Sequence, residues 1–142
     1  MTNKKKFRKP SQRKGKNVKD RVTEVNTTSI EYPVFGFKYI NKELHPDKID
    51  PENQKALLNQ LCKLSELTWN QIISAPRHGL GTEDVRQEDL NFSLPAHIAN
   101  DVRIIALRYS GKLAMVGYRS NGNVFHILGV DMDFNRSCYK HD

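Results

Sequence analysis

The stretch YRSNGNVFHILGVD near the C-terminus constrains the fold of this chain more than any other part of the sequence. It places Asn121 and Gly122 between two alternating apolar runs, and Asn-Gly favours a type I′ turn because both central residues need φ > 0. A second turn at Ser110 and Gly111 precedes it. Residues 102–131 are therefore expected to form a three-stranded antiparallel meander.

A long amphipathic helix is expected upstream of this meander. Asp50 suits the N-cap, Pro51 suits the first helical position, and apolar residues recur at spacings of three and four through Ser74. Pro76 then ends the periodic segment. We expect the apolar face of this helix to pack on the sheet.

Three shorter elements complete the expected fold. Residues 32–40 alternate aromatic and smaller side chains, as an extended segment does, and Thr82 can cap a short helix. A second short helix is expected from Ser93 to about Asn100. The pattern predicts an α+β fold in which N-terminal helices cover one face of a small antiparallel sheet, with residues 22–142 as a single domain.

Positive charge is concentrated at the N-terminus. The chain carries a net charge of +7, and residues 1–21 hold ten Lys and Arg against one Asp. This segment is expected to be a disordered basic arm, because it has too few apolar side chains to offset the entropy of ordering. It serves either as a tether to RNA or the ribosome or as a solubilising extension. Nucleic-acid contacts are expected from Lys4, Lys5, Lys6, Arg8, Lys9, Arg13, Lys14, Lys16, Arg77, Lys112 and Lys140.

The turns also predict which side chains share a face of the meander. A two-residue loop at 121–122 places Arg119 opposite Val124, and it sends Arg119 and His126 to one side, about 7–8 Å apart at Cα. Arg108 falls on the same side. Because a charge inside a sheet is costly unless it is paired or solvated, this face is expected to be open to water or a ligand. The opposite face is expected to be the core: Ile105, Leu107, Val116, Tyr118, Phe125 and Ile127.

Two arginines and a histidine on one face predict a phosphodiester site. RNA can be cleaved without a metal when a base deprotonates the 2′-hydroxyl, an acid protonates the leaving oxygen and a guanidinium stabilises the phosphorane. His126 is the expected acid or base, and Arg108 and Arg119 are expected to hold the charge. The candidates for the second proton carrier are His78, Tyr139 and His141.

The same residues also have structural interpretations. His126 can hydrogen-bond a loop, the two arginines can pair with carboxylates of the helical half, and His97 can be structural or exposed. The alternative function is a non-catalytic RNA-binding or ribosome-binding module. Growth arrest, RNA cleavage in EDTA and the salt dependence of RNA affinity distinguish these interpretations.

The meander with Arg119 and the ending RSCYKHD, residues 136–142, resemble the RelE/ParE superfamily of bacterial toxins. The resemblance implies helices packed on one face of the sheet and mRNA cleavage on the other. It implies that Arg119 stabilises the transition state and that Tyr139 or His141 acts in proton transfer or base stacking. An antitoxin would be the inhibitory partner, and a ParE-like branch would inhibit gyrase instead.

Other classes of protein lack support in the sequence. There is no apolar run of about 20 residues and no apolar segment after the basic N-terminus, so no membrane association is expected. Cys62 and Cys138 show neither disulfide nor zinc spacing, which favours a cytoplasmic protein. No cofactor and no metal site are expected, because phosphate-loop, dinucleotide and C-x-x-C motifs are missing.

Overall fold

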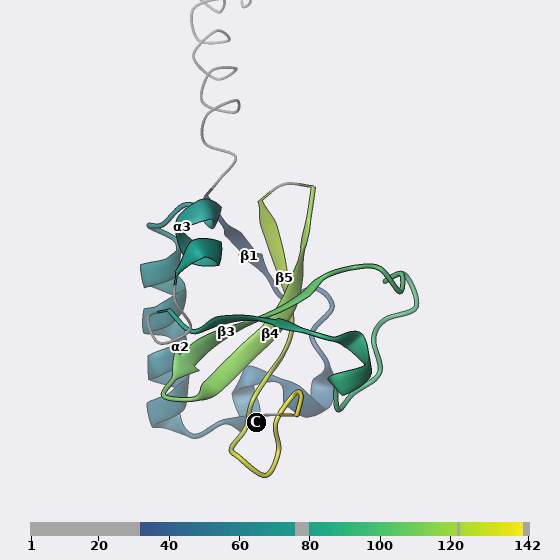
Figure 1. The fold of residues 1–142 in the computed structure, drawn as a ribbon. Helices are drawn as coiled ribbons and strands as arrows, with labels where there is room; N and C mark the ends of the chain where they lie inside the picture. Colours follow the sequence, from purple (N-terminus) through teal and green to yellow (C-terminus); the bar gives the residue numbers. More distant parts are fainter. Residues whose placement is uncertain (1–31, 76–79, 122, 141–142) are drawn as a thin grey trace, which may run out of the picture. The chain divides into compact units, whose positions relative to one another are not determined.

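The computed structural model describes residues 32–75, 80–121 and 123–140, all within one compact α+β unit. The expected basic arm lies outside these residues. In chain order the elements are β1 (Val34–Gly36), η2 (Lys42–Leu44), η3 (Pro46–Lys48), α2 (Pro51–Leu64), α3 (Trp69–Ser74), β2 (Thr82–Val85), η4 (Gln87–Asp89), β3 (Ile104–Ser110), β4 (Leu113–Ser120) and β5 (Val124–Val130) (Figure 1).

The described strands form one five-stranded sheet in the order β1-β5-β4-β3-β2. The predicted meander is present as β3, β4 and β5, which pair antiparallel. The sheet is nevertheless larger than predicted and mixed, because β1 pairs in parallel with β5 and β2 extends the other edge. The helix expected after Thr82 is wrong, since Thr82 pairs with Leu107 as the first residue of β2.

The predicted long helix is divided into two. α2 starts as expected, with the Asp50 carboxylate accepting from the Asn53 amide at 2.8 Å, but it ends at Leu64. Thr68 then caps α3 in a reciprocal box: its hydroxyl accepts from the Gln71 amide, and the Gln71 side chain accepts from the Thr68 amide. This local capping competes with helix continuation, and it starts a new helix instead. The helix expected from Ser93 is also wrong, because that segment forms turns.

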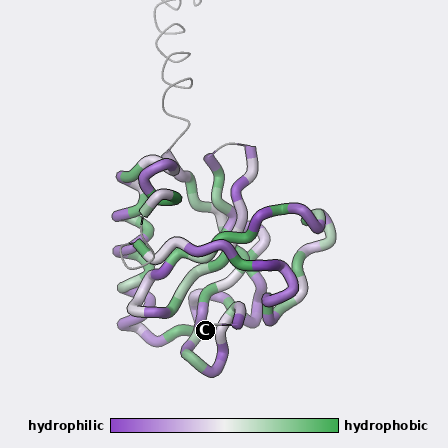
Figure 2. The backbone as a smooth tube through the Cα atoms, in the orientation of Figure 1, coloured by the Kyte–Doolittle hydropathy of each residue, from purple (hydrophilic) through white to green (hydrophobic). Residues whose placement is uncertain are grey.

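Both faces of the sheet centre are covered. On one face, Trp69 of α3 packs against Phe125. On the opposite face, two non-helical segments lie on the sheet: His97 contacts Tyr118, and Tyr139 contacts Glu83. Hydrophobic stretches, green in Figure 2, run along the strands. The face that carries His126 was expected to be open, but it is buried at its centre: Ile104, Ala106 and Leu128 are each at most 1% exposed.

A buried carboxylate holds the C-terminal segment on the sheet. Asp131 is 0% exposed, and its two oxygens accept from the backbone amides of Ala114 at 2.8 Å and Cys138 at 2.7 Å. The Tyr109 hydroxyl donates to the Asp131 carbonyl at 2.6 Å. These bonds position Tyr139, which follows Cys138 directly. In the part of the chain described, no helix has the length and apolar character that crossing a bilayer requires.

Candidate functional site

The connection between β4 and β5 decides which side chains share a face. Ser120 pairs with Val124, so the turn contains three residues and Arg119 lies opposite Phe125. The prediction of a two-residue turn with Arg119 opposite Val124 is wrong. Because side chains alternate along a strand, this shift of one residue moves Arg119 to the face opposite His126, whose partner is Tyr118.

Arg119 lies on the helix-covered face. Its guanidinium carbon is 4.5 Å from the centre of the Trp69 ring, and the Trp69 indole donates to the Asn123 carbonyl at 3.1 Å. Burial lowers the pKa of Arg119, and the charge of Arg103 adds to this effect. A cation over an indole face is a stabilising contact. The structure therefore removes Arg119 from the site predicted around His126.

Four aromatic rings gather on the opposite face: Tyr39, His97, Tyr118 and His126, named here the four-ring cluster. His126 stacks on Tyr118 with centroids 4.9 Å apart, and His97 hydrogen-bonds the Tyr118 hydroxyl at 2.9 Å. Tyr39 contacts both imidazoles, with centroids 4.4 Å from His97 and 5.4 Å from His126. Strands β4 and β5 supply two of the rings, and the segments after β1 and before β3 supply the others. His97 is exposed, so the cluster is reached from solvent.

The two nitrogens of His126 have different environments. Nε2 lies 2.7 Å from the Ser120 hydroxyl oxygen, whereas Nδ1 is buried and has no hydrogen-bond partner among the described residues. The direction of the hydrogen bond to Ser120 depends on which nitrogen carries the proton. A protonated Nε2 donates to the hydroxyl oxygen, whereas an unprotonated Nε2 accepts from the hydroxyl.

Charge and burial keep His126 neutral. Burial lowers its pKa, and the charges of His97 and Lys38 lower it further. Lys38 also lies near the cluster, with its ammonium 5.4 Å from the Tyr39 ring centre. The positive charge of Lys38 beside the cluster favours a bound anion.

The sequence also suggested that Gly117 leaves space beside the His126 imidazole, but the structure gives it another role. Gly117 pairs with Ile127, and a Cβ at this position would meet first the backbone carbonyl of His126 and then the Phe125 ring, at 2.9 Å. Gly117 therefore allows the close approach of the β5 backbone and of the Phe125 ring. The predicted space beside the imidazole on β4 is occupied by Tyr118 instead.

Two other predicted site residues, Arg108 and Tyr139, lie near each other but not in the cluster. The Tyr139 hydroxyl donates to Glu83 at 3.4 Å, at the edge of hydrogen-bonding distance. Burial raises the pKa of Tyr139, and the negative charge of Glu83 acts in the same direction, whereas Arg108 lowers it. Tyr139 therefore remains a protonated phenol at neutral pH. Its neighbour Glu83 was not predicted from the sequence.

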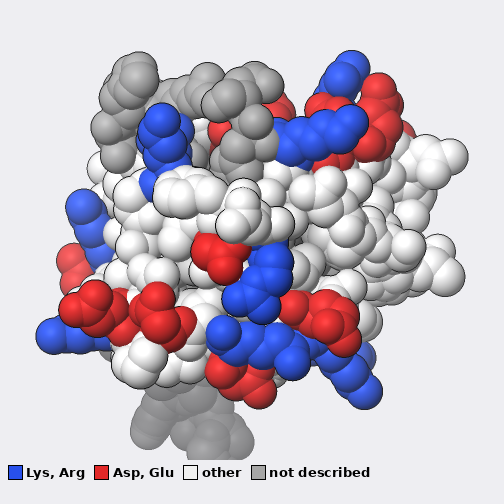
Figure 3. Space-filling view, turned by 90° about the horizontal axis from the view of Figure 1, so that it is seen from below, with Lys and Arg blue, Asp and Glu red and all other residues white. Residues whose placement is uncertain are grey.

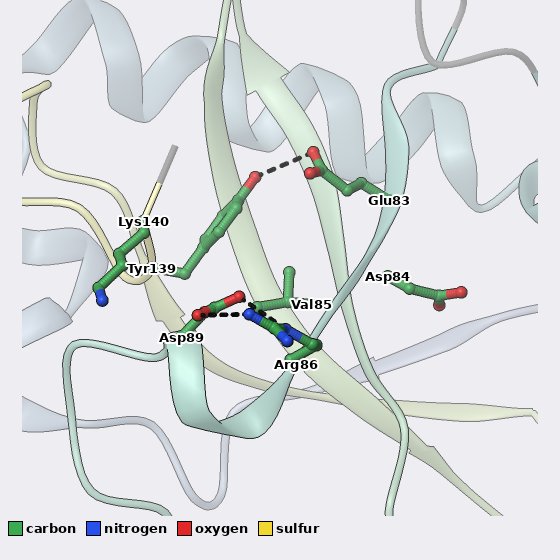
Figure 4. A pocket seen from close by; sticks show the side chains of 7 residues that line it. All are labelled: Glu83, Asp84, Val85, Arg86, Asp89, Tyr139 and Lys140. Carbon is green, nitrogen blue, oxygen red and sulfur yellow. Dashed lines mark hydrogen bonds and ion pairs between the residues drawn. The ribbon is translucent and has the colours of Figure 1, made fainter. Parts of the chain in front are cut away.

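Tyr139 lines a pocket of about 520 Å³ (Figure 4). Arg86 in this pocket is committed to the carboxylate of Asp89, to which its Nε atom lies at 3.2 Å. Three of the lining side chains are carboxylates and two are cationic, a balance that does not favour a polyanion. The full lining is Glu83, Asp84, Val85, Arg86, Asp89, Tyr139 and Lys140.

Charges of both signs are also interspersed on the face seen in Figure 3. Lys112 is exposed in the β3–β4 turn, and Lys140 is exposed beside the pocket. His78, His141 and Arg77 lie outside the described residues, as do the cations expected in the basic arm. Within the described residues no group of three His, Cys, Asp or Glu is arranged to hold a metal ion.

The sequence indicated one member of the four-ring cluster, His126, and missed its neighbours. His97 carried no periodic or motif signal, and Tyr39 belonged to an expected strand without an assigned face. Tyr118 was assigned to the core because of the incorrect register. Comparisons of the chain with protein-family models, curated proteins and solved structures found no match.

Proposed function

We propose that this protein is an endoribonuclease that cleaves RNA by acid–base catalysis at the four-ring cluster. The observation that carries the proposal is the placement of two imidazoles around one tyrosine: His126 stacks on Tyr118 and His97 binds its hydroxyl. Cleavage of RNA needs one proton acceptor and one proton donor, because the nucleophile is the substrate's own 2′-hydroxyl.

The environments of the two histidines favour different roles. His126, whose pKa is lowered, is the base: its unprotonated Nε2 takes the 2′-hydroxyl proton, directly or through the Ser120 hydroxyl. Exposed His97, in its imidazolium form, gives a proton to the leaving 5′-oxygen. Lys38 supplies positive charge near the developing phosphorane, and the Tyr39 ring offers a surface on which a base can stack. The products are a 2′,3′-cyclic phosphate and a 5′-hydroxyl end.

The toxin interpretation belongs to the same proposal. The RelE/ParE resemblance implies mRNA as the substrate, cleavage in the cytoplasm or on the ribosome, and an antitoxin as inhibitor. Expression of the wild-type protein would then arrest growth, and expression of His126→Ala would be tolerated. Growth arrest by both proteins would show that toxicity does not need this imidazole.

Cleavage of RNA in EDTA by the purified protein tests the proposal. We expect cyclic-phosphate ends from RNA and no cleavage of DNA of the same sequence, because DNA lacks the 2′-hydroxyl. His45→Ala is a matched control, since it removes an imidazole bound to Asp47 elsewhere on the surface. RNA that remains intact while it binds would contradict the proposal, and it would favour the non-catalytic RNA-binding module.

The aromatic rings beside Lys38 are the observation that favours this second candidate function. Exposed aromatic faces and cations bind single strands without chemistry. A binding module would show RNA affinity with a linear log–log salt dependence, reduced by removal of residues 1–21.

A further inference from the structure

A separate recess lies where the end of α2 meets the β3–β4 turn. Its volume is about 240 Å³, and Lys63 and Arg108 are its charged side chains. No carboxylate lines it. The full lining is Gln60, Lys63, Leu80, Arg108, Tyr109, Ser110 and Gly111. None of these residues belongs to the four-ring cluster, so an inference about this recess does not depend on the proposed cleavage.

The two cations of the recess can be compared with the other arginines that the structure describes. Three of these, Arg86, Arg103 and Arg136, each form an ion pair with an aspartate, and Arg119 packs over the Trp69 ring. Among the described residues, neither Lys63 nor Arg108 has such a partner. The charge of Lys63 has a structural explanation, because Lys63 lies in the last turn of α2, where a cation complements the helix dipole. Arg108 adds a second cation to the same recess, so the recess offers two cations and no carboxylate to a ligand.

The backbone of Gly81 fixes the course of the Arg108 side chain. A Cβ at Gly81 would come within 2.9 Å of the Arg108 Cβ and closer still to the atoms that follow it, so the arginine stem passes directly over this glycine. Gly81 also has φ +74°, a conformation that side chains with a Cβ rarely adopt. The guanidinium is therefore partly preorganised, which reduces the entropy lost when it binds a ligand.

The other lining residues carry hydrogen-bond donors. Ser110 has a hydroxyl, Gln60 has a side-chain amide, and Gly111, which lies in the turn with φ +59°, has a backbone N–H. Backbone N–H groups in turns bind anions, and a guanidinium fork matches phosphate oxygens. We propose that this recess binds a phosphoryl group, held by Arg108 and Lys63 and oriented by the β3–β4 turn.

Two sources can supply a phosphoryl group, namely an RNA strand and a free phosphate. Titrations of the ¹⁵N-labelled full-length protein, monitored by amide chemical shifts, distinguish them. The probes are inorganic phosphate, a short 2′-O-methyl RNA with a 5′-hydroxyl, and the same RNA with a 5′-phosphate. The methylated RNA cannot be cleaved through its 2′-oxygen, so the result is independent of the proposed chemistry.

We expect the Ser110 and Gly111 amides to shift, and we expect Arg108→Gln and Lys63→Gln each to weaken binding by about tenfold. Lys55→Gln is the matched control, because it removes the same charge from α2 about 12 Å along the helix from Lys63. Binding of both RNAs assigns the site to backbone phosphate. Binding of inorganic phosphate and the 5′-phosphorylated RNA alone assigns it to a terminal phosphate. No saturable shift with any probe, or equal weakening by Lys55→Gln, would overturn the proposal.

Discussion

Tyr118 lies directly opposite His126 in the β4–β5 pair, and the two rings stack with centroids 4.9 Å apart. On the other face of the same two strands, Arg119 lies opposite Phe125. The pairing therefore separates the imidazole from the guanidinium that the sequence had placed beside it. It also brings His126 next to aromatic rings that are distant along the chain.

The turn that sets this pairing depends on a left-handed residue. Asn121 has φ 43°, the one positive value among described residues other than glycine. A β-branched side chain is strained in this conformation, so Asn121→Val should lower the free energy of unfolding by about 1–2 kcal/mol. Asn121→Gly should change it by less than about 0.5 kcal/mol. Urea denaturation of both variants checks the difference, and equal losses would contradict a left-handed conformation at this position.

Removal of the buried Asp131 carboxylate should lower the free energy of unfolding more than the Asn121 substitutions do. Asp131→Ala leaves the amides of Ala114 and Cys138 without their acceptor, and we expect a loss of about 3 kcal/mol in the free energy of unfolding. Asp101→Ala, at an exposed position, should cost less than about 0.5 kcal/mol. Chemical denaturation measures both values. Similar stabilities for the two variants would show that Asp131 does not anchor the C-terminal segment.

The stability of the protein should depend on pH through His126. Its pKa is lowered in the folded state, so the unfolded chain, with a histidine pKa of about 6.5, binds this proton more readily. The contribution of neutral His126 to the free energy of unfolding is fully present above pH ~6.5, and it is lost as the pH falls through that value towards the folded-state pKa. The melting temperature should therefore decrease less in His126→Asn than in the wild-type protein between about pH 7.5 and about pH 5. Parallel decreases in the two proteins would contradict this sign.

The elements that follow from local chemistry were predicted well. Asp50 and Pro51 determine where α2 begins, and alternating apolar residues determine the β3–β5 meander, because caps and strand periodicity act within a few residues. The pairing of β1 with β5 and of β2 with β3 was missed. Edge strands of three and four residues carry little periodicity, and tertiary contacts decide their partners.

The candidate site was predicted less well, for a specific physical reason. The face on which each strand residue lies depends on the number of residues in a turn, and Asn121-Gly122 is compatible with both two-residue and three-residue connections. One extra residue moved Arg119 to the other face. The contribution of His97 depends on how a non-helical segment folds over the sheet, which no local pattern specifies.

RNA cleavage rates of two variants test the central claim most directly, because the structure places Arg119 and His126 on opposite faces of the sheet. We predict that His126→Ala lowers kcat/KM in EDTA by about 100-fold or more, as loss of a general base does. Arg119→Gln, assayed at a temperature where it is fully folded, should stay within about threefold of the wild-type value, since it removes no transition-state contact. An Arg119→Gln variant as inactive as His126→Ala, or a fully active His126→Ala, would contradict catalysis at the four-ring cluster.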